Sequence, residues 1–111
     1  MQDKRVKLFS DGACRGNPGL GGAGAVITDE TDHILWEGKE YLGHCTNNIA
    51  EYRALLLGLK GALAQGYGHL EIFLDSELLA KQINGSYKVK NEKLKMLMQD
   101  VRRLLSSFQS V

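Results

Sequence analysis

Three acidic residues stand at positions where their carboxylates could act together. Asp11 and Asp75 each follow an apolar run, and Glu51 lies between them in a segment with helical periodicity. Carboxylates that converge without a basic partner repel one another unless a cation neutralises them. Ligation by oxygen atoms alone suits Mg²⁺ or Mn²⁺. The three residues therefore form a candidate metal-dependent catalytic centre.

Each of these residues also has a purely structural interpretation. Asp11 stands before a glycine and could be a turn residue. Glu51 follows Asn48 by three positions and could complete a capping box, and Asp75 could cap a short helix. Taken one at a time, the structural interpretations are favoured. Only the joint placement of the three carboxylates favours the catalytic one.

The hydropathy pattern predicts the elements that would position them. Alternating apolar residues indicate strands, and apolar residues spaced three and four apart indicate helices. The predicted strands cover residues 6–11, 24–28, 33–42 and 70–74, and the predicted helices cover 48–65, 76–83 and 91–108. The first three strands should form an antiparallel meander. The order predicts an α/β fold in one domain over residues 1–111.

A strand–helix–strand crossover places the fourth strand parallel to the first and beside it. The carboxyl ends of these two strands then share one edge of the sheet, where ligands of open α/β sheets bind. Asp11 and Asp75 should meet at this edge. Packing decides whether Glu51, in the first turn of the crossover helix, reaches it as well.

Polar and glycine-rich segments flank the same edge. Four short hydrogen-bonding side chains there could contact sugar hydroxyls or base edges, although helix starts also explain two of them: Asn17, Thr46, Asn47 and Asn48. Residues 19–24 match G-x-G-x-x-G, but a strand follows where a dinucleotide site needs a helix. We interpret these glycines as allowing a tight turn and close backbone approach to a partner.

Composition sets the class of protein. With 43% hydrophobic and 24% charged residues, the chain is predicted to be globular, and no apolar run is long enough to cross a membrane. The first residues run straight into a strand pattern without a signal peptide, which favours the cytoplasm. Two cysteines, Cys14 and Cys45, are predicted to lie in two loops near each other. Free thiols in a reducing compartment are favoured over a disulfide between them.

Net charge is only +1, but its distribution is uneven. Residues 81–103 hold seven basic and two acidic side chains, a local charge of +5, and include Lys88, Lys90 and Lys93. Such a segment is either a solvated helix face or a surface that follows nucleic-acid phosphates.

Three ordered blocks closely resemble the signature blocks of type 1 ribonucleases H, in particular the compact bacterial and archaeal branch. They are FSDGACRGNPG at 9–19, TNNIAEYRAL at 46–55 and IFLDS at 72–76. The resemblance implies a ribonuclease H-like fold and hydrolysis of the RNA strand of RNA–DNA hybrids with two Mg²⁺ or Mn²⁺ ions, leaving 3′-hydroxyl and 5′-phosphate ends.

The resemblance also assigns residues. Asp11, Glu51 and Asp75 match the catalytic, metal-binding carboxylates of the family. Positions that match or adjoin its substrate contacts are Cys14, Arg15, Gly16, Asn17, Thr46, Asn47, Asn48 and Ser76. Lys88 and Lys90 of the basic segment are added as candidate phosphate contacts.

Members of that family continue past the position of Val111 with a fifth strand, a histidine-bearing loop and a helix that begins with a fourth aspartate. Without these elements, we expect weakened or Mn²⁺-dependent activity. The pattern also leaves Phe9 and Phe73 on a sheet face that no predicted helix covers. An open apolar face is a pairing site, so a homodimer is expected.

Two other classes remain open. The chain could be a hybrid-binding module without turnover, because one carboxylate of the family pattern is missing. It could also be the core of a transposase or integrase, which shares the fold and an acidic triad. The segments 14–19 and 46–48 disfavour this last class.

Overall fold

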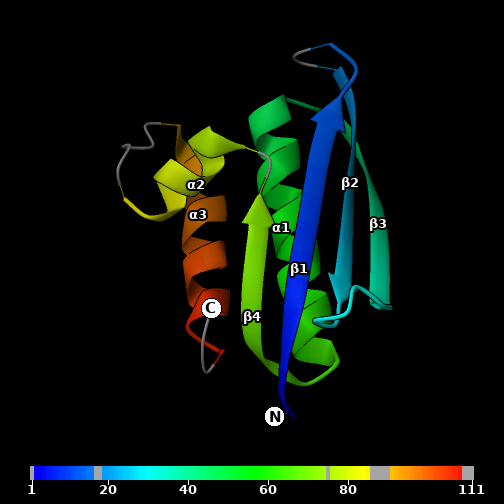
Figure 1. Ribbon diagram of the computed structural model, residues 1–111. Coiled ribbons are helices and arrows are strands. Elements are labelled where there is room, and N and C mark those ends of the chain that lie inside the picture. The colour runs from blue at the N-terminus through cyan, green and yellow to red at the C-terminus, as the bar shows by residue number, and fades with distance from the viewer. Residues whose placement is uncertain (1, 17–18, 75, 86–90, 109–111) are drawn as a thin grey trace.

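The computed structural model describes residues 2–16, 19–74, 76–85 and 91–108. Along the chain the elements are β1 (Gln2–Cys14), β2 (Gly19–Thr28), β3 (Ile34–Cys45), α1 (Asn47–Ala64), β4 (Tyr67–Leu74), α2 (Glu77–Ile83) and α3 (Glu92–Leu105) (Figure 1). This is the predicted order. In the described part of the chain, no helix is long and apolar enough to span a membrane.

The sheet has the strand order β3-β2-β1-β4. β2 is antiparallel to both of its neighbours, and β4 is parallel to β1. The predicted mixed topology is therefore confirmed. α1 is the crossover between β3 and β4, and it packs along the sheet while α3 packs against α1 (Figure 1).

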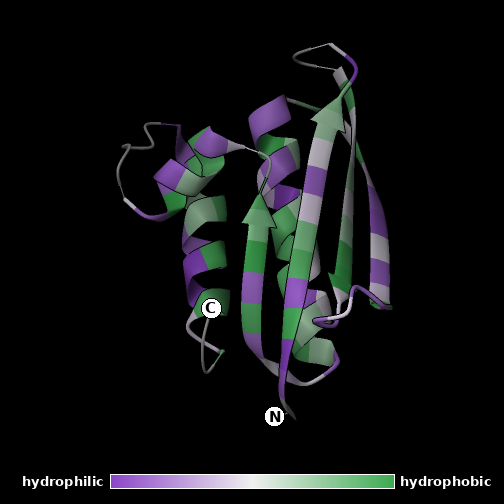
Figure 2. Ribbon diagram, in the orientation of Figure 1, coloured by the Kyte–Doolittle hydropathy of each residue, from purple (hydrophilic) through white to green (hydrophobic). Residues whose placement is uncertain are grey.

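The core lies between the sheet and α1. Sheet residues Val6, Leu8 and Ile27 are fully buried there, as are Tyr52 and Leu59 of the helix. Burial of such a side chain contributes roughly 1.5–3 kcal/mol. Figure 2 shows hydrophobic residues in green among hydrophilic residues in purple along both the strands and the helices. The core thus fixes how α1 lies against β1, the strand that carries Asp11.

The opposite sheet face is open over the described residues. Phe9 and Phe73 are each 39% exposed, and their rings stack with centroids 4.9 Å apart. They are direct neighbours in the parallel pairing of β1 with β4. The placement of both rings on an uncovered face is as predicted.

The strands are longer than predicted. β1 continues to Cys14, β2 begins at Gly19 and β3 ends at Cys45, so the prediction of a glycine-rich turn over residues 19–24 was wrong. Periodicity misses such a strand because glycine has no side chain to alternate. β2 is held instead by backbone pairing on both sides, to β1 and to β3. The two cysteines accordingly end strands rather than lie in loops.

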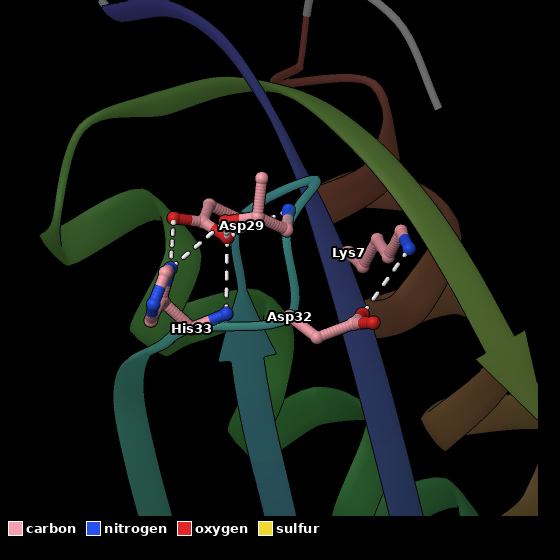
Figure 3. Close-up of polar contacts among 5 residues, drawn as sticks. Lys7, Asp29, Asp32 and His33 are labelled. Atoms are coloured by element: carbon pink, nitrogen blue, oxygen red, sulfur yellow. Dashed lines mark hydrogen bonds and ion pairs between the residues drawn. The ribbon is translucent and has the colours of Figure 1, made fainter.

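A compact turn joins β2 to β3 at the other end of the sheet. The Asp29 carboxylate accepts hydrogen bonds from the Thr31 hydroxyl at 2.7 Å, the Thr31 amide at 2.8 Å and the His33 amide at 3.0 Å (Figure 3). These bonds, the Thr31 hydroxyl first, lower the pKa of Asp29 to about 2. Nearby, Lys7 pairs with Asp32 at 3.3 Å. The Asp29 carboxylate therefore has a structural role in holding this turn.

Candidate active site

Close contact between β1 and the start of α1 builds the site. Gly12 lies directly against the backbone of Ala50, and a Cβ at Gly12 would overlap the Ala50 carbonyl and lie 2.7 Å from the Glu51 nitrogen. No residue but glycine allows so close an approach. The approach brings Glu51 next to the strand residue that precedes Gly12, which is Asp11.

Asp11 and Glu51 line one small hollow of about 80 Å³. Its other walls come from β1, the last residue of β4, the N-cap of α2 and the core side of α2: Ser10, Gly12, Leu74, Ser76 and Leu79. Asp75 lies outside the described residues, but both of its neighbours along the chain line this hollow. The structure therefore brings together two of the three predicted carboxylates.

The structural interpretations of these carboxylates do not hold. The N-cap of α1 is Thr46, whose hydroxyl accepts from the Ile49 amide at 3.2 Å, so Glu51 forms no capping box with Asn48. The N-cap of α2 is Ser76, whose hydroxyl accepts from the Leu79 amide at 3.1 Å.

Asp11 is not a turn residue either, because it lies within β1 and pairs with Gly24 of β2. Helix capping and turn formation thus explain neither Asp11 nor Glu51. The capping position that sequence reasoning offered to Asp75 is taken by Ser76.

Within the described part of the chain, neither Asp11 nor Glu51 has a polar partner. Over the described residues, no hydrogen bond and no ion pair involves either carboxylate. Asp11 is exposed and Glu51 half-buried. The described residues contain no group of three metal-ligating side chains. The third predicted carboxylate, Asp75, is not among the described residues. Two unpaired carboxylates beside serine hydroxyls provide oxygen atoms only, the ligand type of hard divalent cations.

The segments predicted to contact substrate join beside this hollow. The Cys14 amide donates to the Asn47 side-chain oxygen at 3.0 Å, which ties the end of β1 to the first turn of α1. The Arg15 amide donates to the Leu20 carbonyl at 2.8 Å and closes the turn between β1 and β2. Arg15 and Gly16 are exposed there. These residues form one surface beside the hollow. Asn17, also predicted to contact substrate, lies outside the described residues.

Two predicted side chains have structural roles or surroundings that the sequence did not indicate. Thr46 uses its hydroxyl to cap α1. Asn48 has a buried side-chain oxygen without a hydrogen-bond partner among the described residues. Such a buried, unsatisfied oxygen is unfavourable for folding.

The basic segment is mostly neutralised where the structure describes it. Three of its cations pair with nearby carboxylates: Lys81 with Glu77, Lys95 with Glu92, and Arg103 with Asp100. These pairs fit a solvated helix face. Lys88 and Lys90 lie outside the described residues, so their predicted phosphate contacts stay predictions.

Sequence reasoning did not single out Ser10, which lines the hollow with both carboxylates. The alternation of β1 carried the signal, because Ser10 lies two residues from both Leu8 and Gly12 and so shares their helix-facing side. A polar residue on an otherwise buried strand face marks the point where the core ends and the site begins.

Comparison with known proteins agrees with this geometry. The family model described as reverse transcriptase-like matches residues 9–111. The N-terminal RNase H domain of Rv2228c from Mycobacterium tuberculosis superposes with a TM-score of 0.93 at 38% identity, covering 97% of this chain and 78% of that one. The chain belongs to the ribonuclease H family.

Two further ribonucleases H are similar. Ribonuclease HI of Halobacterium salinarum is 38% identical over 94% of this chain and 52% of its own length. LC11-RNase H1, solved in complex with an RNA/DNA hybrid, has a TM-score of 0.85 at 35% identity, covering 96% of this chain and 84% of that one. The chain spans about half of the archaeal protein, and only 30% of the full-length bifunctional protein Rv2228c.

Proposed function

We propose that this protein hydrolyses the RNA strand of RNA–DNA hybrids with the help of divalent metal ions. The observation that carries the proposal is the pair of carboxylates, Asp11 and Glu51, that line one hollow beside the end of β4 and have no partner among the residues the structure describes. Its relatives named ribonuclease H, and the hybrid bound by LC11-RNase H1, support the choice of substrate.

The residues of the hollow fit a divalent cation. A volume of about 80 Å³ exceeds the roughly 30 Å³ that one water molecule occupies in the liquid, so an ion and a water have room. Mg²⁺ and Mn²⁺ prefer carboxylate oxygens and water as ligands. Asp11 and Glu51 would hold the ion, with Asp75 as the third predicted ligand.

When bound at such a site, the metal supplies activation of the attacking water and stabilisation of the leaving oxygen. The protein residues have a different task. Asp11 and Glu51 concentrate negative charge at one point, and the contact of Gly12 with Ala50 holds the two carboxylates in place. Preorganised ligands of this kind need no rearrangement when the substrate arrives.

The joined surface of the β1–β2 turn and the start of α1 would hold the hybrid. Arg15 is exposed on it, and the hydrogen bond from Cys14 to Asn47 fixes the turn against the helix. Exposed backbone and short polar side chains suit the wide minor groove of an A-like duplex, where the 2′-hydroxyls of RNA are displayed. The proposal thus explains why cleavage would select the RNA strand.

Cleavage of a hybrid with labelled RNA, in Mg²⁺ and separately in Mn²⁺, tests this function. We expect products with 3′-hydroxyl and 5′-phosphate ends, no cut in the DNA strand, and loss of cleavage in Asp11→Asn. Asp29→Asn is the matched control, because its carboxylate lies in the turn at the other end of the sheet. Cleavage only in Mn²⁺ would fit the weakened site expected from the sequence.

Two results would contradict the proposal. If the parent protein binds hybrid and never cleaves it, the binding-module alternative is correct. If it leaves hybrid intact and cuts duplex DNA, the transposase or integrase alternative returns.

We propose separately that a second copy of the chain covers the open sheet face. The stacked Phe9 and Phe73 rings, each 39% exposed, are the apolar surface that such a copy would bury. Sedimentation at micromolar concentration should show a dimer that Phe9→Ser weakens. A stable monomer would exclude this arrangement.

A further inference from the structure

The two cysteine side chains meet beside Gly21 of the inner strand β2. Cys14 ends β1 and Cys45 ends β3, and β2 runs between these strands. Cys14 pairs with Gly21 of β2, and Gly21 has no side chain. A Cβ at Gly21 would overlap the Cys45 sulfur and lie 3.5 Å from the Cys14 Cβ. Because Gly21 has no side chain, there is room beside it for both cysteine side chains.

The Cys45 thiol also influences the pKa of Cys14. Burial first, and then the neighbouring Cys45 thiol, raise the pKa of Cys14, while the Gly19 amide acts in the opposite direction. An electrostatic effect of this kind requires the two sulfur atoms to be close. Cys14 is half-buried, whereas Cys45 is only 8% exposed. A dissolved oxidant would reach Cys14 first.

We propose that Cys14 and Cys45 form a reversible intramolecular disulfide by exchange with a small-molecule disulfide such as oxidised glutathione. The Cys14 thiol loses its proton, and its sulfur attacks the glutathione disulfide and releases one glutathione thiolate. The Cys45 thiol then loses its proton and displaces the second glutathione from Cys14. Two protein thiols are oxidised by two electrons, and one glutathione disulfide is reduced to two thiols.

The site of this bond gives it a consequence for the proposed function, on which this part of the inference rests. The Cys14 thiol can donate its single proton to the Asn47 side-chain oxygen at 3.0 Å or to the Gly16 carbonyl at 2.8 Å. A disulfide removes this donor. It also links the end of β1 to the residue before Thr46, the N-cap of α1. Oxidation would therefore alter the surface proposed to hold the hybrid.

Thiol counting after equilibration in glutathione buffers tests the disulfide itself. The full chain is incubated at increasing ratios of oxidised to reduced glutathione, quenched with acid, alkylated and weighed by mass spectrometry. We expect both thiols to disappear together, with a loss of two hydrogen atoms and no bound glutathione. Cys45→Ser should instead retain a mixed disulfide at Cys14, and Cys14→Ser should keep its buried Cys45 as a free thiol. Mixed disulfide or free thiols as the only products of the parent would overturn the proposal.

Two further measurements separate this geometry from simple thiol reactivity. Gly21→Ala introduces a Cβ where the Cys45 sulfur lies, so the disulfide should form at least tenfold more slowly, while Gly24→Ala, with open space around its Cβ, should react like the parent. Because the pKa of Cys14 is raised, the rate should also increase with pH throughout the neutral range. Equal rates in Gly21→Ala and the parent would contradict the assignment.

Hybrid binding then tests the consequence. The disulfide should weaken affinity on the order of 5-fold, as expected when one hydrogen bond of about 1 kcal/mol no longer fixes the proposed binding surface. A protein that forms the disulfide but binds hybrid in neither state would refute the proposed function and leave the disulfide intact. Equal affinity of both states would refute the switch.

Discussion

The carboxylates at the two ends of the sheet differ in their hydrogen bonding. At the β2–β3 turn, Asp29 accepts three hydrogen bonds, and its pKa falls to about 2. At the other end, Asp11 and Glu51 line one hollow, and over the described residues neither accepts a hydrogen bond or pairs with a cation. Both arrangements are built from ordinary strand ends and turns.

The difference distinguishes a carboxylate that stabilises the fold from carboxylates that do not. Hydrogen bonds to an ionised carboxylate contribute to stability, so the fold gains from Asp29. Two carboxylates in one hollow repel each other and contribute nothing comparable. The contrast between the hydrogen-bonded Asp29 and the open pair supports our proposal that Asp11 and Glu51 bind a ligand of opposite charge.

Loss of one site carboxylate should have the largest effect. Glu51→Gln keeps the size of the side chain and removes its charge, so hybrid cleavage should fall by about 1,000-fold or more. Thermal stability should stay the same or rise, because repulsion with Asp11 is relieved. Cleavage rates and melting temperature are measured on the same preparation. Undiminished cleavage would remove Glu51 from the site.

A side chain at Gly12 should separate β1 from α1. Gly12→Ala would place a Cβ against the Ala50 backbone, and overpacking of this kind lowers the free energy of unfolding by roughly 1–3 kcal/mol. Gly24→Ala is the control, because its Cβ meets nothing closer than 3.9 Å. Urea unfolding should show a lower midpoint for Gly12→Ala alone. Equal midpoints would mean that the strand and helix are not in tight contact.

Removal of the saturated carboxylate should have the smallest effect. The pKa of Asp29 is about 2 in the folded chain against an ordinary 3.8, so its contribution is present above pH 3.8 and is lost as pH falls through 2. Asp29→Ala should therefore lower the melting temperature slightly at pH 6, with the difference from the parent vanishing near pH 2. Hybrid cleavage should not change. A difference that is constant with pH would contradict the hydrogen-bonded turn.

The elements that carry the two open carboxylates could be predicted from the sequence. The crossover between residues 33–42 and 70–74 fixed the parallel neighbours, which places Asp11 beside the end of β4. The periodicity of residues 48–65 predicted the helix that carries Glu51. Local patterns suffice here because each element has its own hydrophobic repeat.

The remaining features depend on backbone contacts that leave no periodic signal. The strand from Gly19 was missed because glycine shows no alternation, and the meeting of Cys14 with Cys45 depends on the missing side chain of Gly21. The approach of Glu51 to Asp11 likewise depends on packing at Gly12. Tertiary contact, rather than local preference, decides each of these.

Calorimetric titration of Mn²⁺ into the metal-free protein at neutral pH tests the central claim most directly, because it needs no substrate. The account predicts binding by the parent and by Asp29→Asn with equal affinity, and at least tenfold weaker binding by Asp11→Asn, equivalent to about 1.4 kcal/mol. Binding that is equally tight in Asp11→Asn, or absent from the parent, would show that the open carboxylates are not a cation site.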